Sequence, residues 1–139
     1  MAAPFTLRGL DHIVLRVKAL QPMLHFYTVV LGGTLERQQE ELGLYQVRTG
    51  ATLVDLVPLD GKLGRAGGAG PGREGRNLDH FALRIEPYDE DAIRTHLRSH
   101  GIEPGESGSR YGAEGEGPSI YLADPEGNLL ELKGPPRGP

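Results

Sequence analysis

The sequence predicts an α+β fold in which two βαβββ modules form a cupped, eight-stranded mixed sheet. The first reason is an internal repeat, because Leu10–Val17 and Leu78–Ile85 both begin with Leu-Asp-His and carry Leu-Arg near their end. The second is that a helical pattern and then short alternating segments follow each copy. The third is a glycine-rich stretch between the two halves. Together these features indicate a duplicated supersecondary unit.

Composition narrows the class of protein. A chain of 139 residues suits one domain, spanning 1–139, in which two small modules share a core. The absence of cysteine excludes disulfides, thiolate metal sites and a cysteine nucleophile. A formal net charge of −4, without a run of Lys or Arg, argues against nucleic acid as a partner. Because no long apolar segment or signal-like start is present, we expect a cytoplasmic protein with no membrane partner.

Module one is expected to span residues 8–58. In its first strand, Leu10–Val17, apolar and polar positions alternate, so His12 and Arg16 share one face. A helix follows, with Pro22 in its first turn and an apolar stripe with helical spacing that ends before a Gly-Gly pair. Three strands separated by glycine turns complete the module: Thr34–Glu41, Leu44–Thr49 and Thr52–Val57.

Residues 59–76 are rich in glycine and are predicted to be a flexible linker. Module two, residues 77–134, repeats the pattern with a strand at Asn77–Ile85. Its helix is expected to start after Asp89 as N-cap and to run to His100. The remaining strands are predicted at Ile102–Glu106, Ser119–Ala123 and Leu129–Lys133, with a loop at 107–117.

The repeat places one histidine on the first strand and one carboxylate on the last strand of each module. His12 and Asp55 occupy these positions in module one, and His80 and Glu131 occupy them in module two. Two imidazoles and a carboxylate around one cavity suit a divalent ion such as Zn, Ni, Mn or Fe(II). The alternative is a pair of structural core histidines, together with an Asp55 that is solvated at a strand edge.

Several segments of the chain resemble one known family. They are Leu10–Leu15, Phe26-Tyr27 with Leu31-Gly32, Leu78–His80 and Tyr121–Glu131. These segments are similar to the vicinal oxygen chelate superfamily, which includes glyoxalase I, extradiol dioxygenases, fosfomycin-resistance proteins and bleomycin-binding proteins. The chain is most similar to short glyoxalase-like proteins, some of which are virulence-associated. The resemblance implies the glyoxalase-like fold and covers nearly the whole chain.

The resemblance also implies a site. Its metal ligands would be His12, His80 and Glu131, holding a divalent ion that chelates two adjacent oxygens of a small substrate. Glu131 and Asp55 would be the catalytic proton carriers. In glyoxalase I a fourth ligand, Glu, stands where this chain has Asp55, and the shorter side chain argues against a strict glyoxalase I assignment.

Substrate contacts are expected from Arg110, Tyr111 and Tyr121. The resemblance favours a metal-dependent lyase or isomerase, with an extradiol-type ring-cleaving dioxygenase or a non-catalytic drug- or metabolite-binding protein as alternatives. It also implies a homodimer in which module one of one subunit and module two of the other assemble each site. Pairing of both modules within one chain is the alternative.

Overall fold

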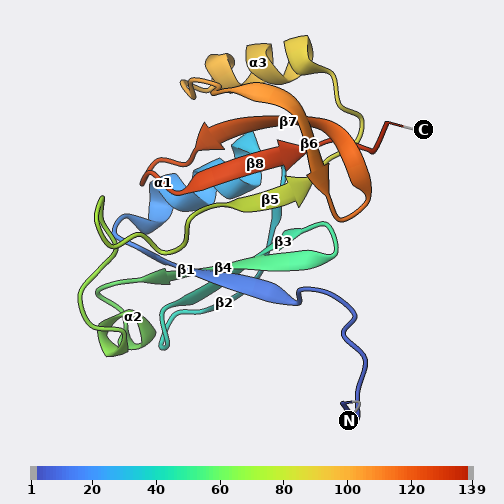
Figure 1. Ribbon diagram of the computed structural model, residues 1–139. Coiled ribbons are helices and arrows are strands. Elements are labelled where there is room, and N and C mark those ends of the chain that lie inside the picture. Colours follow the sequence, from blue (N-terminus) through green and yellow to red (C-terminus); the bar gives the residue numbers. More distant parts are fainter. Residues whose placement is uncertain (1–2, 138–139) are drawn as a thin grey trace.

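Two four-stranded sheets form the protein, and the computed structural model describes residues 3–137 of the chain (Figure 1). In the first sheet the strand order is β1-β4-β3-β2. Here β1 is parallel to β4, and the other neighbours are antiparallel. The elements of this half are β1 (His12–Val17), α1 (Leu20–His25) with its π-helical continuation η1 (Phe26–Val30), β2 (Thr34–Gln39), β3 (Leu44–Thr49) and β4 (Thr52–Pro58).

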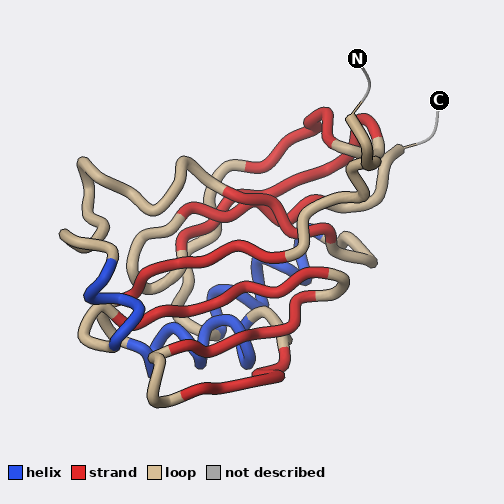
Figure 2. The backbone as a smooth tube through the Cα atoms, turned by 90° about the horizontal axis from the view of Figure 1, so that it is seen from below, coloured by secondary structure: helices blue, strands red, loops and turns tan. Residues whose placement is uncertain are grey.

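The second sheet repeats this topology with the order β5-β8-β7-β6. Strand β5 is parallel to β8, and the other neighbours are antiparallel. Its elements are β5 (Phe81–Arg84), α3 (Glu90–Ser99), β6 (Ser107–Gly112), β7 (Gly115–Ala123) and β8 (Leu129–Lys133). The predicted α+β class with two βαβββ modules is therefore confirmed, and Figure 2 shows the strands following one another across the molecule. Within residues 3–137 no helix has the length and hydrophobicity needed to cross a membrane.

The two faces of each sheet differ as the alternation in the sequence predicts. On β1, Leu15 and Val17 are fully buried in the core, whereas His12 and Val14 are exposed. The core is one continuous cluster to which both modules contribute. The face of each sheet that carries His12 or His80 lies opposite the core. We call it the cup face.

One predicted strand is wrong. The strand expected at Ile102–Glu106 is absent, and 107–117, expected to be a loop, forms most of the β6–β7 hairpin. Pro104 has no N–H to donate to a ladder, and the N–H of Ile102 bonds the Leu97 carbonyl at the end of α3. Strand β6 instead forms where β7 offers a partner, although its own residues have low strand propensity.

Residues 59–76 contain more regular structure than the flexible linker that the sequence predicts. They include the short helix α2 (Lys62–Ala66). The guanidinium group of Arg16 on β1 donates hydrogen bonds to the carbonyls of Gly64, Gly68 and Ala69, at 2.6 to 3.0 Å. Arg16 therefore attaches this segment to module one.

A polar network joins the two modules. The buried Tyr27 hydroxyl of module one donates to Asp124 Oδ2 at 2.8 Å, and the side-chain amide of Asn128 donates to the same oxygen at 2.8 Å. Asn77 in turn donates to Asn128 Oδ1 and to the Arg16 carbonyl. The loop 124–128 thus acts as a joint between modules.

Alkaline pH is expected to destabilise this joint through Tyr27. Burial first, and then the charge and hydrogen bond of Asp124, raise the pKa of Tyr27 well above its ordinary value. Above about pH 10 the unfolded state loses a proton that the folded state keeps, so the free energy of unfolding falls as pH rises. In an alkaline titration, the last tyrosinate absorbance should appear together with loss of the circular dichroism signal.

The Tyr27→Phe variant is the control for this titration, and its remaining tyrosines should ionise before the fold is lost. Complete tyrosine ionisation in a folded wild-type protein would contradict the expectation.

Candidate functional site

The two predicted carboxylates occupy equivalent places in the two sheets. Each lies in the middle of the strand that pairs with the first strand of its module. Both are buried, with 3% of Asp55 and 7% of Glu131 exposed. Their cross-strand neighbours are Val14 and Gln46 for Asp55, and Ala82 and Tyr121 for Glu131. The sequence repeat is therefore also a structural repeat around these two acids.

Each carboxylate faces the histidine of its own module. The distance from His12 Nε2 to Asp55 Oδ2 is 3.9 Å, and that from His80 Nε2 to Glu131 Oε1 is 3.7 Å. These nearly equal distances arise because each histidine lies two residues before the residue that pairs with the acid. The structure thus builds two equivalent histidine–carboxylate pairs.

The aspartate that precedes each histidine orients its ring. His12 Nδ1 lies 2.7 Å from Asp11 Oδ2, and His80 Nδ1 lies 2.6 Å from Asp79 Oδ2. A carboxylate only accepts hydrogen bonds, so Nδ1 carries the proton and the lone pair of the neutral ring is on Nε2, toward the buried acid. Histidine ligands of metals are commonly oriented in this way.

The same contacts alter the acidity of these groups. The hydrogen bond that His12 donates to Asp11 and then the charge of Asp55 raise the pKa of His12. The hydrogen bond from His80 lowers the pKa of Asp79. Each shift favours the charged form of the group concerned, the imidazolium of His12 and the carboxylate of Asp79.

His12 and His80 line one cavity of about 310 Å³ between β1 and β5, with mostly apolar residues around them. Among residues 3–137, however, no three His, Asp or Glu side chains lie close enough together to hold one metal ion. The structure therefore brings together His12 with Asp55 and His80 with Glu131. Within one chain it does not gather His12, His80 and Glu131 into a single ligand set.

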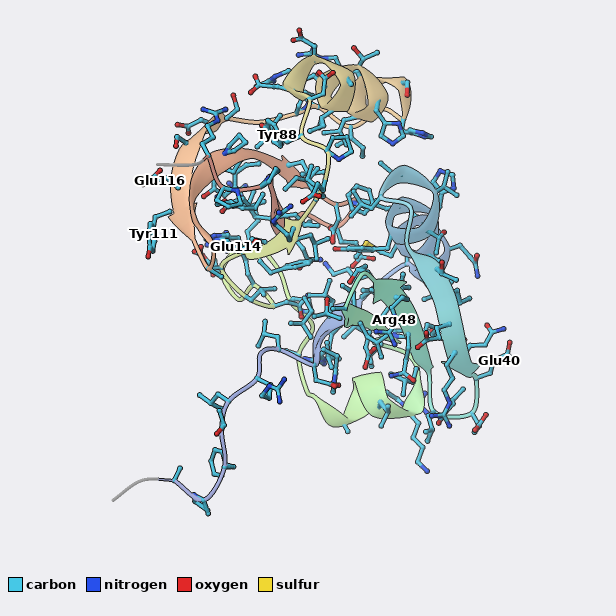
Figure 3. All side chains as sticks on the ribbon, turned by 90° about the vertical axis from the view of Figure 1, so that its right-hand side faces the viewer. Glu40, Arg48, Tyr88, Tyr111, Glu114 and Glu116 are labelled. Carbon is cyan, nitrogen blue, oxygen red and sulfur yellow. The ribbon has the colours of Figure 1, made fainter. Side chains whose placement is uncertain are left out.

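The predicted substrate contacts divide into two groups. The Tyr121 ring lies edge-on to the His80 ring at 5.6 Å between centroids, and Arg110 Cζ lies 5.2 Å from the Tyr121 ring centre. Tyr111 is 81% exposed and points away from the body of the protein in Figure 3. Tyr121 and Arg110 therefore extend the module-two pair, and Tyr111 does not contact it.

Sequence reasoning missed three contributors to the pairs, namely Gln46, Asp11 and Asp79. The side-chain amide of Gln46 lies 3.3 Å from both oxygens of Asp55, in the place that Tyr121 takes beside Glu131. Only the β3–β4 register reveals this contact. Asp11 and Asp79 were visible in the repeat itself, since an aspartate precedes each histidine, but were given no role.

Known structures share this architecture. An integron cassette protein from the mobile metagenome of V. cholerae aligns with a TM-score of 0.70 and 25% identity, covering 94% of this chain and 97% of that one. A virulence protein from Salmonella typhimurium aligns at 0.72 and 24%, covering 94% and 99%. The fosfomycin resistance protein FosX from Listeria monocytogenes aligns at 0.65 and 21%, covering 93% and 94%.

The sequence comparison agrees with the fold. The family model described as Glyoxalase/Bleomycin resistance protein/Dioxygenase superfamily matches residues 9–132. This match includes both histidine–carboxylate pairs and the joint between the modules. The chain belongs to this superfamily.

Proposed function

We propose that this protein is a metal-dependent lyase or isomerase that acts on a small metabolite with two adjacent oxygens. His12, His80 and Glu131 are its metal ligands, and the ion is Zn, Ni, Mn or Fe(II). The observation that supports this proposal is the pair of equivalent histidine–carboxylate contacts, at 3.9 and 3.7 Å, each with an aspartate behind the imidazole.

The donor chemistry of these residues fits such an ion. Each pair offers one imidazole nitrogen and one carboxylate oxygen, and together the two pairs offer a mixed N/O set. Asp55 is buried, and the neutral Gln46 amide is its closest hydrogen-bond partner among the described residues. A cation nearby would compensate such a buried charge. When bound, the ion supplies Lewis-acid polarisation of the substrate oxygens.

The remaining chemistry belongs to the side chains of the chain. We propose that Glu131 and Asp55 carry the proton that a lyase or isomerase reaction moves, because both are buried and each lies beside the histidine of its own module. The Gln46 amide holds Asp55 in place. The Tyr121 ring packs beside His80 and limits its movement.

The ligand set is completed by a second copy of the chain. One chain holds its donors as separate pairs, and the cup face beside them exposes apolar side chains, with Leu10 at 74% and Val14 at 49%. Because the pairs are equivalent, twofold pairing of two chains can place module one of one subunit against module two of the other. We therefore propose a homodimer with two shared sites.

Metal binding tests the proposal directly. Protein purified without chelator should contain a divalent metal or take up Zn²⁺ in calorimetric titration. The His80→Ala variant should bind Zn²⁺ about a hundredfold more weakly or worse, since a ligand matters at least as much as the groups behind it. The exposed His100→Ala variant is the matched control. A wild-type protein that binds no added ion, or a His80→Ala variant with wild-type affinity, would refute the proposal.

A metal-free binding protein is the second candidate. The mostly apolar cavity of about 310 Å³ between β1 and β5 favours it, because such a cavity suits capture of a small apolar ligand. Under this candidate, adding or removing a divalent metal ion would not change the affinity for the apolar ligand.

A further inference from the structure

We propose that module two carries an anion-binding surface beside Glu131, formed by Arg110, Ser119 and Lys133. The substrate would then carry a phosphate, phosphonate or carboxylate group and would enter with this group toward module two. The link to a substrate rests on the proposed function above. The anion surface itself rests on the following observations.

The three side chains belong to one face of neighbouring strands. Ser119 of β7 pairs with Lys133 of β8, as Tyr121 pairs with Glu131 two residues further along. On the other side, Arg110 of β6 pairs with Gly117 of β7. Residues two apart on a strand share a face, so all three lie on the cup face with Glu131. Lys133 and Glu131 also line one cavity of about 210 Å³.

Glycines keep the two cations close to the sheet. A Cβ atom on Gly108 would lie 2.6 Å from Arg110 Nη1, so the guanidinium group lies directly over that backbone. Cβ atoms on Gly112 and Gly117 would lie 3.0 Å from Lys133 Cε and 3.1 Å from Lys133 Nζ. The glycines of this hairpin thus form a floor on which both charged side chains rest.

The donors on this floor are poorly satisfied. Ser119 is 0% exposed, and its Oγ has no hydrogen-bond partner among the described residues. Within residues 3–137 no carboxylate lies in ion-pair range of Lys133, and Arg110 meets Glu106 only at 3.5 Å, at an 81% exposed side chain. A buried hydroxyl without a partner is uncommon, and two cations beside it suit an anionic oxygen.

Module one lacks this surface, although it repeats the rest. The positions two residues beyond the acids are Lys133 in module two and Val57 in module one. By the register in which Gln46 matches Tyr121, Leu44 stands where Ser119 does. At these two positions module one is therefore apolar, whereas module two carries a cation and a hydroxyl. This difference gives the substrate a single orientation.

Calorimetric titration with inorganic phosphate tests the surface. Lys133→Met and Arg110→Met should each weaken phosphate binding about tenfold, as expected for loss of a charged hydrogen-bond donor. Ser119→Ala should weaken it by a smaller factor. The matched controls are Lys18→Met and Arg73→Met. These residues line a separate cavity of about 580 Å³ that also has cationic side chains in its wall, and both variants should bind phosphate as the wild type does.

Parallel Zn²⁺ titrations separate this proposal from the proposed function. Lys133→Met should lose phosphate affinity while its Zn²⁺ affinity stays near that of the wild type. If the wild-type protein binds phosphate through Lys133 but takes up no metal, the anion surface is supported and the proposal of a metal-dependent enzyme is refuted. Phosphate binding that is absent from the wild type, or that depends on Lys18 or Arg73 instead, would overturn the anion surface.

Discussion

An equimolar mixture of His12→Ala and His80→Ala subunits is expected to recover about a quarter of the wild-type metal sites. Each variant alone has no site with a complete set of ligands. If the sites are shared, a mixed dimer contains one site with both substitutions and one with none. Random exchange makes about half of the dimers mixed, which gives this fraction. If each site is built within one chain, every site stays damaged and nothing is recovered.

The measurement is bound metal per chain after the separately purified variants are mixed, exchanged in mild denaturant and returned to buffer. A mixture of His80→Ala and Glu131→Ala is the matched control. Both substitutions lie in module two, so every shared site receives one of them and no recovery is expected. A monomer by light scattering that binds metal fully would also exclude the shared site.

The Asp124→Ala variant is expected to lose about 3 to 4 kcal/mol of unfolding free energy. Asp124 is 5% exposed, and its Oδ1 accepts hydrogen bonds from the backbone N–H groups of Glu126 and Asn128. Its Oδ2 accepts from the Tyr27 hydroxyl and the Asn128 amide. Truncation leaves these donors without their acceptor inside the protein, and the modules lose their joint.

Urea denaturation monitored by circular dichroism measures this loss. Asp60→Ala, which removes an exposed aspartate, should stay within about 0.5 kcal/mol of the wild type. A similarly small change for Asp124→Ala would show that the network contributes little to stability. A lower slope with denaturant in this variant would indicate that the two modules no longer unfold together.

Most of the fold could be predicted because its pattern is local and is written twice. The bounds of β3 and β8 agree with the sequence prediction, and Asp89 caps α3 by accepting from the Ala92 N–H. Strand β6 could not be predicted in this way, because its residues favour a loop and only pairing with β7 makes them a strand. Helix α2 was missed because glycines surround and interrupt it. Gly61 precedes the helix, Gly64 lies within it and Gly67 follows it.

The candidate site was predictable in its parts and not in its assembly. The repeat identified both histidines and both acids, and strand parity placed them on one face. The contact of Gln46 with Asp55, and the place of Ser119 beside Lys133, depend on how antiparallel strands are aligned. Alignment of this kind is fixed by tertiary packing. Under the proposed function, completion of the ligand set depends on a second chain, on which one sequence carries no direct information.

The joint at 124–128 has a consequence for how relatives of this protein are recognised. It is the most distinctive stretch of the sequence. Its side chains form hydrogen bonds that connect the two modules, and none of these bonds involves His12 or His80. Substitutions that alter the chemistry of the histidine–carboxylate pairs can therefore leave this stretch, and the fold that it stabilises, unchanged.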